Sequence, residues 1–198
     1  MMRRSLLAIL ALWLVGLAAC SLPLSRMTSP GTPESPTARI ERGLMDATDL
    51  PFGWSRRSTG VPQDQMGGIA RYRDYQGPPR YAIPFVRAGQ IIYLYTNETE
   101  SCAAYKVLVA ENIPPKYADK WPKPLELDFP VRADEITVGC ISAIMDDIPA
   151  KTCVVIARYG DLVTVVDGQV FEDRWLTMAQ FRRLLERVDR RMTNALPR

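Results

Sequence analysis

Histidine is absent from all 198 residues of the sequence. Histidine is the usual general base beside a serine or cysteine nucleophile, so its absence argues against catalysis of the Ser-His-Asp and Cys-His kinds. It also removes the imidazole ligands of most catalytic zinc and copper sites. The sequence further lacks a Gly-x-Ser-x-Gly motif and a phosphate-binding loop. We therefore expect a protein that is not an enzyme and that holds no metal or other cofactor.

A strong excess of one charge is also missing, with 25 Lys and Arg residues against 22 Asp and Glu residues. Proteins that bind nucleic acid usually carry a pronounced basic patch or stripe. Arg3 and Arg4 belong to the extreme N-terminus, and without them the two signs are almost balanced. The composition therefore predicts no nucleic-acid partner.

Long apolar runs are absent except at the N-terminus, where Leu6–Leu17 is almost uninterrupted. A helix that spans a membrane needs about 20 apolar residues, and this run is shorter. The run follows the basic pair Arg3-Arg4 and ends in small residues, which is the layout of a secretory signal peptide. We predict a signal peptide over residues 1–19. The basic pair also resembles a twin-arginine export signal, although the strong hydrophobicity of the run favours the general secretory route.

The four residues Leu17-Ala18-Ala19-Cys20 resemble the lipobox of bacterial lipoproteins. In that family the cysteine thiol receives diacylglycerol, and cleavage then makes the cysteine the first residue. The resemblance implies a protein of the bacterial cell envelope that is held on the outer face of a membrane by lipid on Cys20. Two or more acyl chains anchor a protein stably, at ~0.8 kcal/mol for each buried methylene group. The alternative is an uncleaved N-terminal anchor in which Cys20 has no role.

Ser21–Ala38 is rich in Ser, Thr, Pro and Gly and shows no apolar periodicity. A segment of this kind cannot bury enough surface to offset its ordering entropy. We interpret residues 20–38 as the lipidated cysteine followed by a tether. Residues 39–198 then form a single domain of ordinary size.

The rest of the sequence alternates between helical and extended patterns. Strands joined by short turns form antiparallel sheets, and helices must cover the faces of such a sheet. The sequence therefore predicts an α+β domain with an antiparallel sheet of about six strands covered by two to three helices. The expected helices are Arg39–Leu50, Glu98–Asn112 and Thr177–Asn194, and the expected strands are Ile69–Gln76, Tyr81–Val86, Gln90–Thr96, Ile136–Ile144, Thr152–Tyr159 and Leu162–Val166.

Three cysteines follow Cys20, namely Cys102, Cys140 and Cys153, so at most one disulfide can form within the domain. An exported protein can oxidise its cysteines. If Asp146-Asp147 is the centre of a hairpin, Cys140 lies opposite Cys153 on the neighbouring strand, close enough for a bridge. We predict the Cys140–Cys153 disulfide and a buried, inert Cys102 thiol. Pairing of Cys102 with either of the other two is the alternative.

Arg158-Tyr159-Gly160-Asp161 is a predicted turn between two apolar strands, and a terminal helix follows within Leu176–Met192. Near the start of the domain, Asp49-Leu50-Pro51-Phe52-Gly53-Trp54 matches a DLP-x-GW pattern. Together these segments resemble the extracellular sensor domains of mycobacterial PknH-like kinases and related secreted lipoproteins, a group similar in fold to PsbP-type proteins. The resemblance implies a PsbP-like sandwich of sheet and helices. It carries no functional residue over to this chain, because a shared fold does not transfer an activity.

Aromatic and basic side chains from two predicted strands form a candidate ligand groove, made of Tyr72, Arg73, Tyr75, Tyr93 and Tyr95. Aromatic faces and guanidinium groups suit a sugar, an anion or a peptide. Simple alternation on a sheet with one covered face would produce the same pattern, and this second interpretation stays open.

The last predicted helix has a charged face that carries Arg182, Arg183, Glu186, Arg187, Asp189, Arg190 and Arg191. A basic face of this kind suits contact with anionic lipid. Its acidic residues, and the i,i+4 spacing of Arg182, Glu186 and Arg190, instead favour a solvated face held by ion pairs.

These observations predict a membrane-anchored envelope lipoprotein that is not an enzyme and that binds an unidentified protein or small ligand. One alternative is an accessory subunit that assembles with a membrane complex, by analogy with PsbP. The other is a histidine-free hydrolase or transferase.

Overall fold

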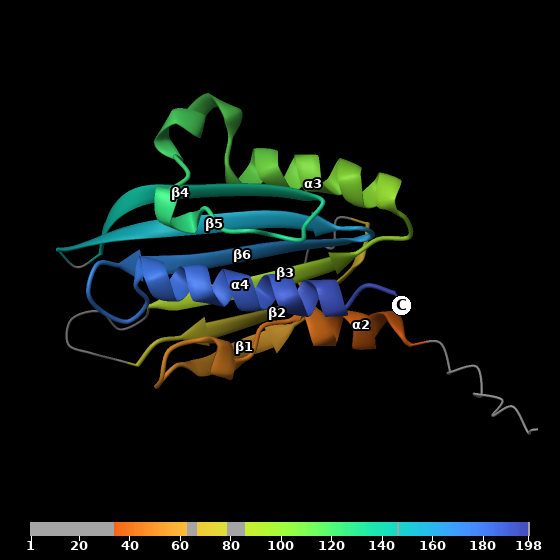
Figure 1. The fold of residues 1–198 in the computed structure, drawn as a ribbon, viewed down its shortest axis with the longest axis horizontal. Coiled ribbons are helices and arrows are strands. Elements are labelled where there is room, and N and C mark those ends of the chain that lie inside the picture. The colour runs from red at the N-terminus through yellow and green to blue at the C-terminus, as the bar shows by residue number, and fades with distance from the viewer. Residues whose placement is uncertain (1–33, 63–66, 79–85, 146, 198) are drawn as a thin grey trace, which may run out of the picture. The chain divides into compact units, whose positions relative to one another are not determined.

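Six strands form one antiparallel sheet, and three helices pack on it, in a computed structural model that describes residues 34–62, 67–78, 86–145 and 147–197 (Figure 1). The strand order across the sheet is β1-β2-β3-β6-β5-β4. This arrangement confirms the predicted α+β class and the antiparallel sheet. The strands are β1 (Ser55–Gly60), β2 (Ile69–Gln76), β3 (Arg87–Leu94), β4 (Glu135–Met145), β5 (Ile148–Tyr159) and β6 (Leu162–Phe171), and the helices are α2 (Pro36–Gly43), α3 (Glu98–Asn112) and α4 (Met178–Asn194).

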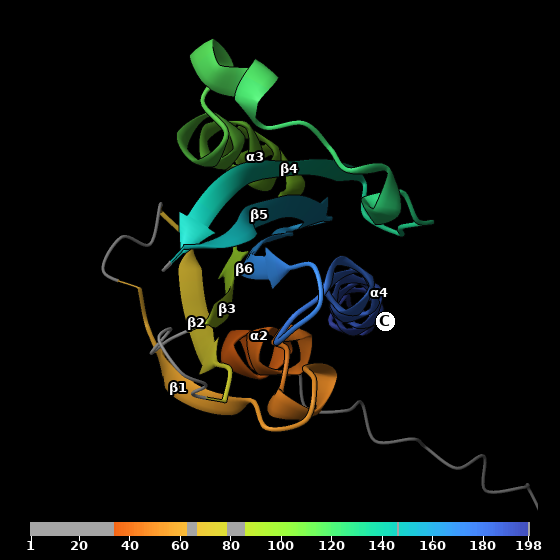
Figure 2. The ribbon, with the colours of Figure 1, turned by 90° about the vertical axis from the view of Figure 1, so that its left-hand side faces the viewer.

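The helices cover opposite faces of the sheet (Figure 2). Helices α2 and α4 lie on one face, over a core cluster that includes Ile92, Val166 and Phe181. Helix α3 lies on the other face, against β5 and β6, over a cluster that includes Ile156 and Val163. Consecutive residues of a strand point to opposite faces, and both faces are covered, so the inner strands β5 and β6 carry buried apolar side chains on both sides.

A buried polar side chain joins the start of the domain to the centre of the sheet. Gln90 of β3 accepts a hydrogen bond from the Met45 amide and donates to the Thr164 hydroxyl (3.1 Å) and the Gly43 carbonyl (3.3 Å). Both polar atoms of the amide group are therefore satisfied although the residue is fully buried. These bonds hold the end of α2 against β3 and β6.

The terminal helix α4 begins where its capping signal predicts. The Thr177 hydroxyl accepts a hydrogen bond from the Gln180 amide (3.3 Å), and the Gln180 side chain accepts one from the Thr177 amide (2.8 Å). One residue of the expected charged face is placed differently, because Asp189 is buried. Its Oδ1 accepts hydrogen bonds from the Arg132 amide (2.9 Å) and the Tyr159 hydroxyl (3.0 Å), so this carboxylate faces the core rather than solvent.

The β5–β6 turn at Gly160-Asp161 connects both helical layers. The Asp161 carboxylate accepts two hydrogen bonds from the Arg39 guanidinium of α2, at 2.9 and 2.7 Å. On the other side, the Gly160 carbonyl accepts one from the Ser101 hydroxyl of α3 at 2.6 Å. Gly160 has a φ of +56°, which glycine adopts without strain. The glycine and the aspartate of this turn are therefore explained by the backbone conformation at Gly160 and by the bonds of Asp161 to Arg39.

The beginning of the domain differs from the sequence prediction. Helix α2 starts at Pro36, because the Ser35 hydroxyl caps the Ala38 amide at 3.2 Å, so the last residues of the expected tether are helical. The expected helix Arg39–Leu50 is wrong in its second half, since α2 ends at Gly43 and a separate 3-10 helix follows over Ala47–Asp49.

The sheet differs from the prediction in one strand, and one predicted strand falls almost wholly outside the described residues. Strand β1 was not expected, because its sequence SRRSTG shows no apolar alternation, and it forms through its pairing with β2. The expected strand Tyr81–Val86 lies, apart from Val86, outside the described residues.

The cysteines pair as predicted. Met145 faces Ile148 at the tip of the β4–β5 hairpin, which brings Cys140 opposite Cys153 in register. A disulfide joins these two buried residues. Cys102 keeps a free thiol, and it is half-buried rather than buried as expected. Within the described part of the chain, no helix has the length and apolar character needed to cross a membrane.

Candidate functional site

The five residues of the predicted ligand groove do not line one groove. Arg73 and Tyr75 face α2 and the segment after it. Both side chains donate hydrogen bonds to the Met45 carbonyl of that segment, at 3.0 and 2.8 Å, and Arg73 is paired with Glu41 of α2. Tyr72 lies on the opposite face, because consecutive residues of a strand alternate between faces. The contacts of Arg73 and Tyr75 therefore serve the packing of α2.

Tyr93 and Tyr95 lie on the face covered by α3. Both are buried within the core cluster beneath that helix, and their stacked rings have centroids 6.4 Å apart. The pattern of tyrosines thus arises from the alternation of side chains along the strands. The sheet is covered on both faces in this region, and not on one face as the alternative interpretation assumed.

A hollow of about 560 Å³ lies where the β4–β5 hairpin, the end of β6 and the start of α4 meet. We call it the hairpin groove. Ile144 exposes 77% of its surface there, which is unusual for so large an apolar side chain. Its lining is mainly apolar, with Ala143, Ile144, Pro149, Ala150, Val170, Phe171 and Met178, while Ser142, Glu126, Lys151 and Glu172 add polar groups.

The groove borders the open edge of β4, the last strand in the sheet order. In an antiparallel ladder, alternate residues direct their N–H and C=O groups away from the partner strand. Cys140 does so, since its amide donates to the Pro122 carbonyl at 3.2 Å outside the sheet. Ser142 and Ile144 follow the same alternation, and no described residue bonds their outward-facing backbone groups.

The two edges of the sheet differ in character. Strand β1 carries Arg56 and Arg57 and has a β-bulge, and both features discourage pairing with another chain. Strand β4 has no charged side chain over Ile136–Met145. An uncharged edge is a template for a further strand where its backbone groups stay unbonded, which here is the end at Ser142 and Ile144. The uncharged run was visible in the sequence, but only the strand order identifies it as an edge.

The tip of the β4–β5 hairpin, which borders the groove, lies at the end of the sheet opposite the start of α2 (Figure 1). Met178, which lines the groove, is the first residue of α4. The far end of α4 contacts α2, where Arg39 donates to the Ala195 carbonyl at 3.1 Å. The groove and the entry point are therefore separated by roughly the length of α4, about 25 Å.

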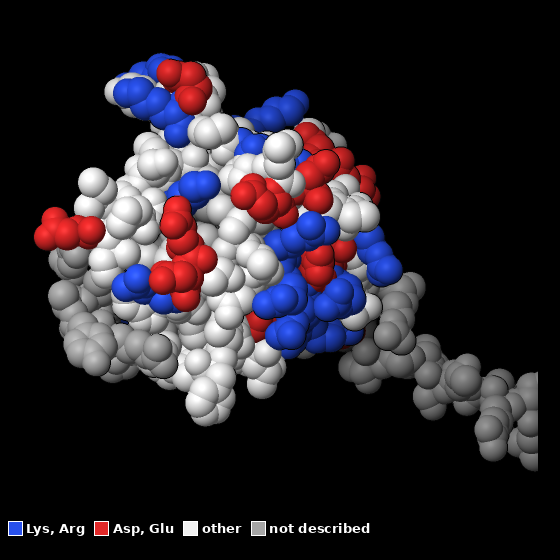
Figure 3. All heavy atoms as spheres, turned by 60° about the vertical axis from the view of Figure 1, so that its left-hand side comes forward, with Lys and Arg blue, Asp and Glu red and all other residues white. Residues whose placement is uncertain are grey.

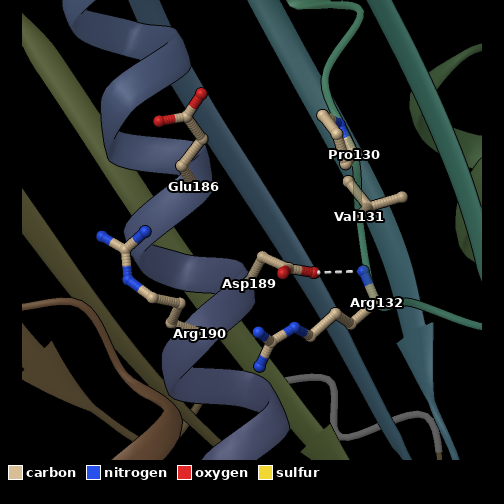
Figure 4. Close-up of a pocket in the computed structure, with 6 residues that line it drawn as sticks. All are labelled: Pro130, Val131, Arg132, Glu186, Asp189 and Arg190. Carbon is tan, nitrogen blue, oxygen red and sulfur yellow. Dashed lines mark hydrogen bonds between the residues drawn. The ribbon is translucent and has the colours of Figure 1, made fainter.

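A second hollow, of about 310 Å³, lies between α4 and the segment before β4 (Figure 4). Its acidic wall includes Asp189, whose carboxylate is already bonded to the Arg132 amide and the Tyr159 hydroxyl. Burial, and then the Asp189 carboxylate, raise the pKa of Tyr159 far above its usual value, so this hydroxyl remains a hydrogen-bond donor. The buried groups of this hollow are satisfied, and the side chains of Arg132 and Arg190 line its open side.

Two carboxylates approach each other across Gly89 on the face opposite α4. A Cβ at Gly89 would lie 2.7 Å from Asp167 Oδ1 and 2.9 Å from Asp74 Oδ1, so only glycine leaves room for both. Asp167 keeps contact with solvent, but the protein atoms crowded around it and the Asp74 carboxylate both raise the pKa of its side chain. Asp74 is bonded to the Ser58 hydroxyl at 3.1 Å.

This pair predicts a pH-dependent stability effect at Asp167. Because its pKa is raised on folding, ionisation of Asp167 costs stability as the pH rises through the folded pKa, and the cost disappears below the unfolded pKa, near ~4. We expect Asp167→Asn to increase the free energy of unfolding by about 0.5 kcal/mol at neutral pH, the usual size for like charges on a sheet. Urea titrations at neutral and at acidic pH measure this difference.

Asp173→Asn is the matched control, because the Arg174 side chain lowers the pKa of Asp173. That variant should show no gain at neutral pH. An equal gain in both variants, or a gain for Asp167→Asn that persists in acid, would contradict the proposed repulsion.

The half-buried Cys102 lines a third, shallow hollow on α3 together with Lys106 and Arg158. Arg158 is already paired with Glu135, with Nε and Oε1 2.7 Å apart. Across the described ranges, no group of three or more Cys, Asp or Glu side chains is placed to hold a metal ion. The hairpin groove is thus the site that combines an apolar hollow with unbonded backbone groups.

No family model, curated protein or solved structure matches the chain. The resemblance to PknH-type sensor domains and PsbP-type proteins therefore remains a prediction from the sequence.

Proposed function

We propose that this protein is a lipid-anchored envelope protein whose domain binds an extended segment of a partner protein in the hairpin groove. The observation that carries the proposal is the open edge of β4, where Ser142 and Ile144 direct unbonded backbone groups outward beside an apolar hollow. An extended peptide satisfies such groups by adding a strand, and its alternate side chains enter neighbouring pockets. A small ligand would leave the edge unpaired.

The groove also indicates what kind of segment fits. Its apolar lining suits branched or aromatic side chains at alternate positions of the added strand. Glu126 and Glu172 are exposed beside the groove, against a single Lys151, so a basic residue flanking the apolar positions is favoured. The partner segment is therefore an uncharged strand with a basic flank.

The proposed location follows from the N-terminal sequence and agrees with the chemistry of the domain. A lipid on Cys20 would hold the chain on the outer face of a bacterial membrane, and disulfides such as Cys140–Cys153 are typical of oxidising compartments. The groove lies at the end of α4 away from the entry of the chain, which leaves it accessible to a membrane neighbour. Membership of a membrane complex as an accessory subunit would use the same contact.

Site-specific photo-crosslinking tests the proposal in native membranes. A benzoylphenylalanine in place of Ile144 should give one discrete adduct, whereas the same probe in place of Arg56, on the opposite edge, should give none. Ser142→Pro removes one outward N–H group without touching the pairing with β5, and should lower the yield at position 144 about tenfold. Ser142→Ala keeps the N–H group and is the matched control.

Two results would contradict the proposal. Equal yields for Ser142→Pro and Ser142→Ala would exclude strand addition, and adducts at both edges would show that contact is not specific. The anchor is tested in the same cells with Cys20→Ser, which should move the protein from the detergent phase to the aqueous phase on phase partitioning. Unchanged partitioning would exclude lipid on Cys20.

A further inference from the structure

Four arginine side chains, on α4 and on the segment before β4, have no carboxylate partner among the described residues. They are Arg132, Arg183, Arg187 and Arg190. Arg183, Arg187 and Arg190 are spaced i, i+4, i+7 and so form one stripe along α4. Arg187 donates to the Thr48 carbonyl at 2.7 Å, which orients its guanidinium without neutralising it. We call these four residues the arginine face.

The neighbouring charges do not cancel this face. Glu186 is paired with Arg182, with Nε and Oε1 3.1 Å apart, and Asp49 is paired with Arg191, with Nε and Oδ2 2.9 Å apart. Asp189 points into the core and is bonded there, as Figure 4 shows for its contact with the Arg132 amide. The two acidic residues of α4 are therefore already bonded, Glu186 to Arg182 and Asp189 to groups in the core. The arginine face keeps an excess of positive charge.

Figure 3 shows this excess as positively charged side chains gathered on one part of the surface, around α4. Arg183 and Arg190 are exposed on α4, and Arg132 is exposed on the segment beside it. A cluster of guanidinium groups without carboxylate partners is a site for anions, because each group retains donors for an incoming oxygen.

The C-terminal end of the arginine face lies near the place where the chain enters the domain, because Arg190 is about one turn before the end of α4. The far end of α4 contacts the first turns of α2 through the hydrogen bond from Arg39 to the Ala195 carbonyl. The fifteen Cα-to-Cα steps from Cys20 to Ser35 span at most about 50 Å when the chain is fully extended. A membrane that holds Cys20 is thus within reach of this face.

We propose that the arginine face binds the anionic phospholipid headgroups of the membrane in which the protein is anchored. The proposal rests on the proposed lipid anchor for the location of the membrane, but the contact itself needs only the folded domain. Because the stripe of arginines runs along α4, the contact lays this helix along the bilayer surface. Each basic residue near an anionic surface strengthens binding about fivefold, and salt weakens the effect.

Vesicle binding of the isolated domain tests the proposal without the lipid anchor. Ser35–Arg198 is a compact unit with its own core and disulfide, so it can be produced alone and checked by its thermal unfolding. We expect it to sediment with phosphatidylcholine vesicles that contain phosphatidylglycerol, to stay in solution with pure phosphatidylcholine, and to be released by high salt. Equal sedimentation with both vesicles would overturn the proposal.

Charge-matched variants locate the contact. Arg183→Gln/Arg187→Gln/Arg190→Gln should lower the partition coefficient on anionic vesicles on the order of a hundredfold. Lys106→Gln/Lys116→Gln/Lys120→Gln removes the same charge from other exposed sites, on α3 and the segment after it, and should change the coefficient less than about threefold. Equal losses in the two variants would overturn the proposal, because net charge alone would then explain binding.

A double variant guards against misfolding. Arg183→Gln/Arg190→Gln leaves the Arg187 contact with Thr48 in place and should still lower the coefficient about 25-fold. Retention of the wild-type coefficient in this variant would overturn the proposal. The crosslinking yield at Ile144 is measured separately on the full chain, so failure of the lipid contact and failure of the hairpin groove are distinguishable.

Discussion

Replacing Asp189 with alanine is expected to lower the free energy of unfolding by about 3 kcal/mol. The Asp189 carboxylate accepts hydrogen bonds from the Arg132 amide and the Tyr159 hydroxyl, and both Asp189 and Tyr159 are buried. Alanine would leave two donors without an acceptor and would open a small cavity beside them. Urea denaturation of the purified domain measures the loss.

Two further variants separate the hydrogen bonds from the change in packing. Asp189→Asn keeps an acceptor oxygen and should cost about 1 kcal/mol. Tyr159→Phe removes one donor, so the double variant with Asp189→Ala should be more stable than the sum of the single losses predicts. Strict additivity, or a loss below about 1 kcal/mol for Asp189→Ala, would show that the carboxylate is not a structural acceptor.

The bonds of Asp189 also matter for the proposed functions. They hold the segment before β4 against α4, and this segment carries Arg132 of the arginine face. If that segment were released, Arg132 would lose its place beside α4.

Removal of the Cys140–Cys153 disulfide is the second change with a large expected effect. The two cysteines are separated by 13 positions, and closing a loop of this size stabilises a fold by about 3 kcal/mol relative to the open chain. We expect Cys140→Ala/Cys153→Ala to lower the free energy of unfolding by about that amount, because both positions are buried in the core cluster under α4. Denaturation curves of the oxidised protein and of the double variant give the difference.

Cys102→Ala provides the control for this experiment. Cys102 is half-buried and unpaired, so its replacement should cost less than about 1 kcal/mol. Thiol titration of the unreduced domain should find one free thiol in the wild type and none in Cys102→Ala. Three free thiols in the wild type would exclude the disulfide.

The disulfide also connects stability with the proposed binding site. Cys140 precedes Ser142 and Ile144 on the same edge strand, and the bridge holds β4 in register with β5. Reduction should therefore lower the crosslinking yield at Ile144 as well as the unfolding midpoint. An unchanged yield after reduction would indicate that the ladder alone maintains the edge.

Several features could be predicted from the sequence because they depend on residues close together in the chain. Helix α3 has the predicted bounds, since Asn97 caps the amide of Glu100 and acidic residues occupy its first turn. The capping box at Thr177 and Gln180 likewise marks the start of α4. The register of the β4–β5 hairpin followed from its short turn, and the register placed Cys140 opposite Cys153.

Other features were not predictable because they arise between distant segments. Strand β1 has no apolar pattern and exists only through its pairing with β2. The burial of Asp189 depends on Arg132 and Tyr159, which lie 57 and 30 positions away in the sequence. The side chains of the predicted tyrosine groove alternate across a sheet whose second face proved to be covered by α3.

The sequence by itself therefore determined the fold class and the cysteine pairing, since nearest-neighbour preferences encode caps, turns and alternation. The export signal stays a prediction from the sequence. Only the tertiary structure decided which strand is an edge, which carboxylates are already bonded and which arginines have no carboxylate partner among the described residues. The reason is physical: sheet order and side-chain pairing result from contacts between segments far apart in the chain, and local preference carries no information about them. Both candidate surfaces, the hairpin groove and the arginine face, could therefore be identified only from the tertiary structure.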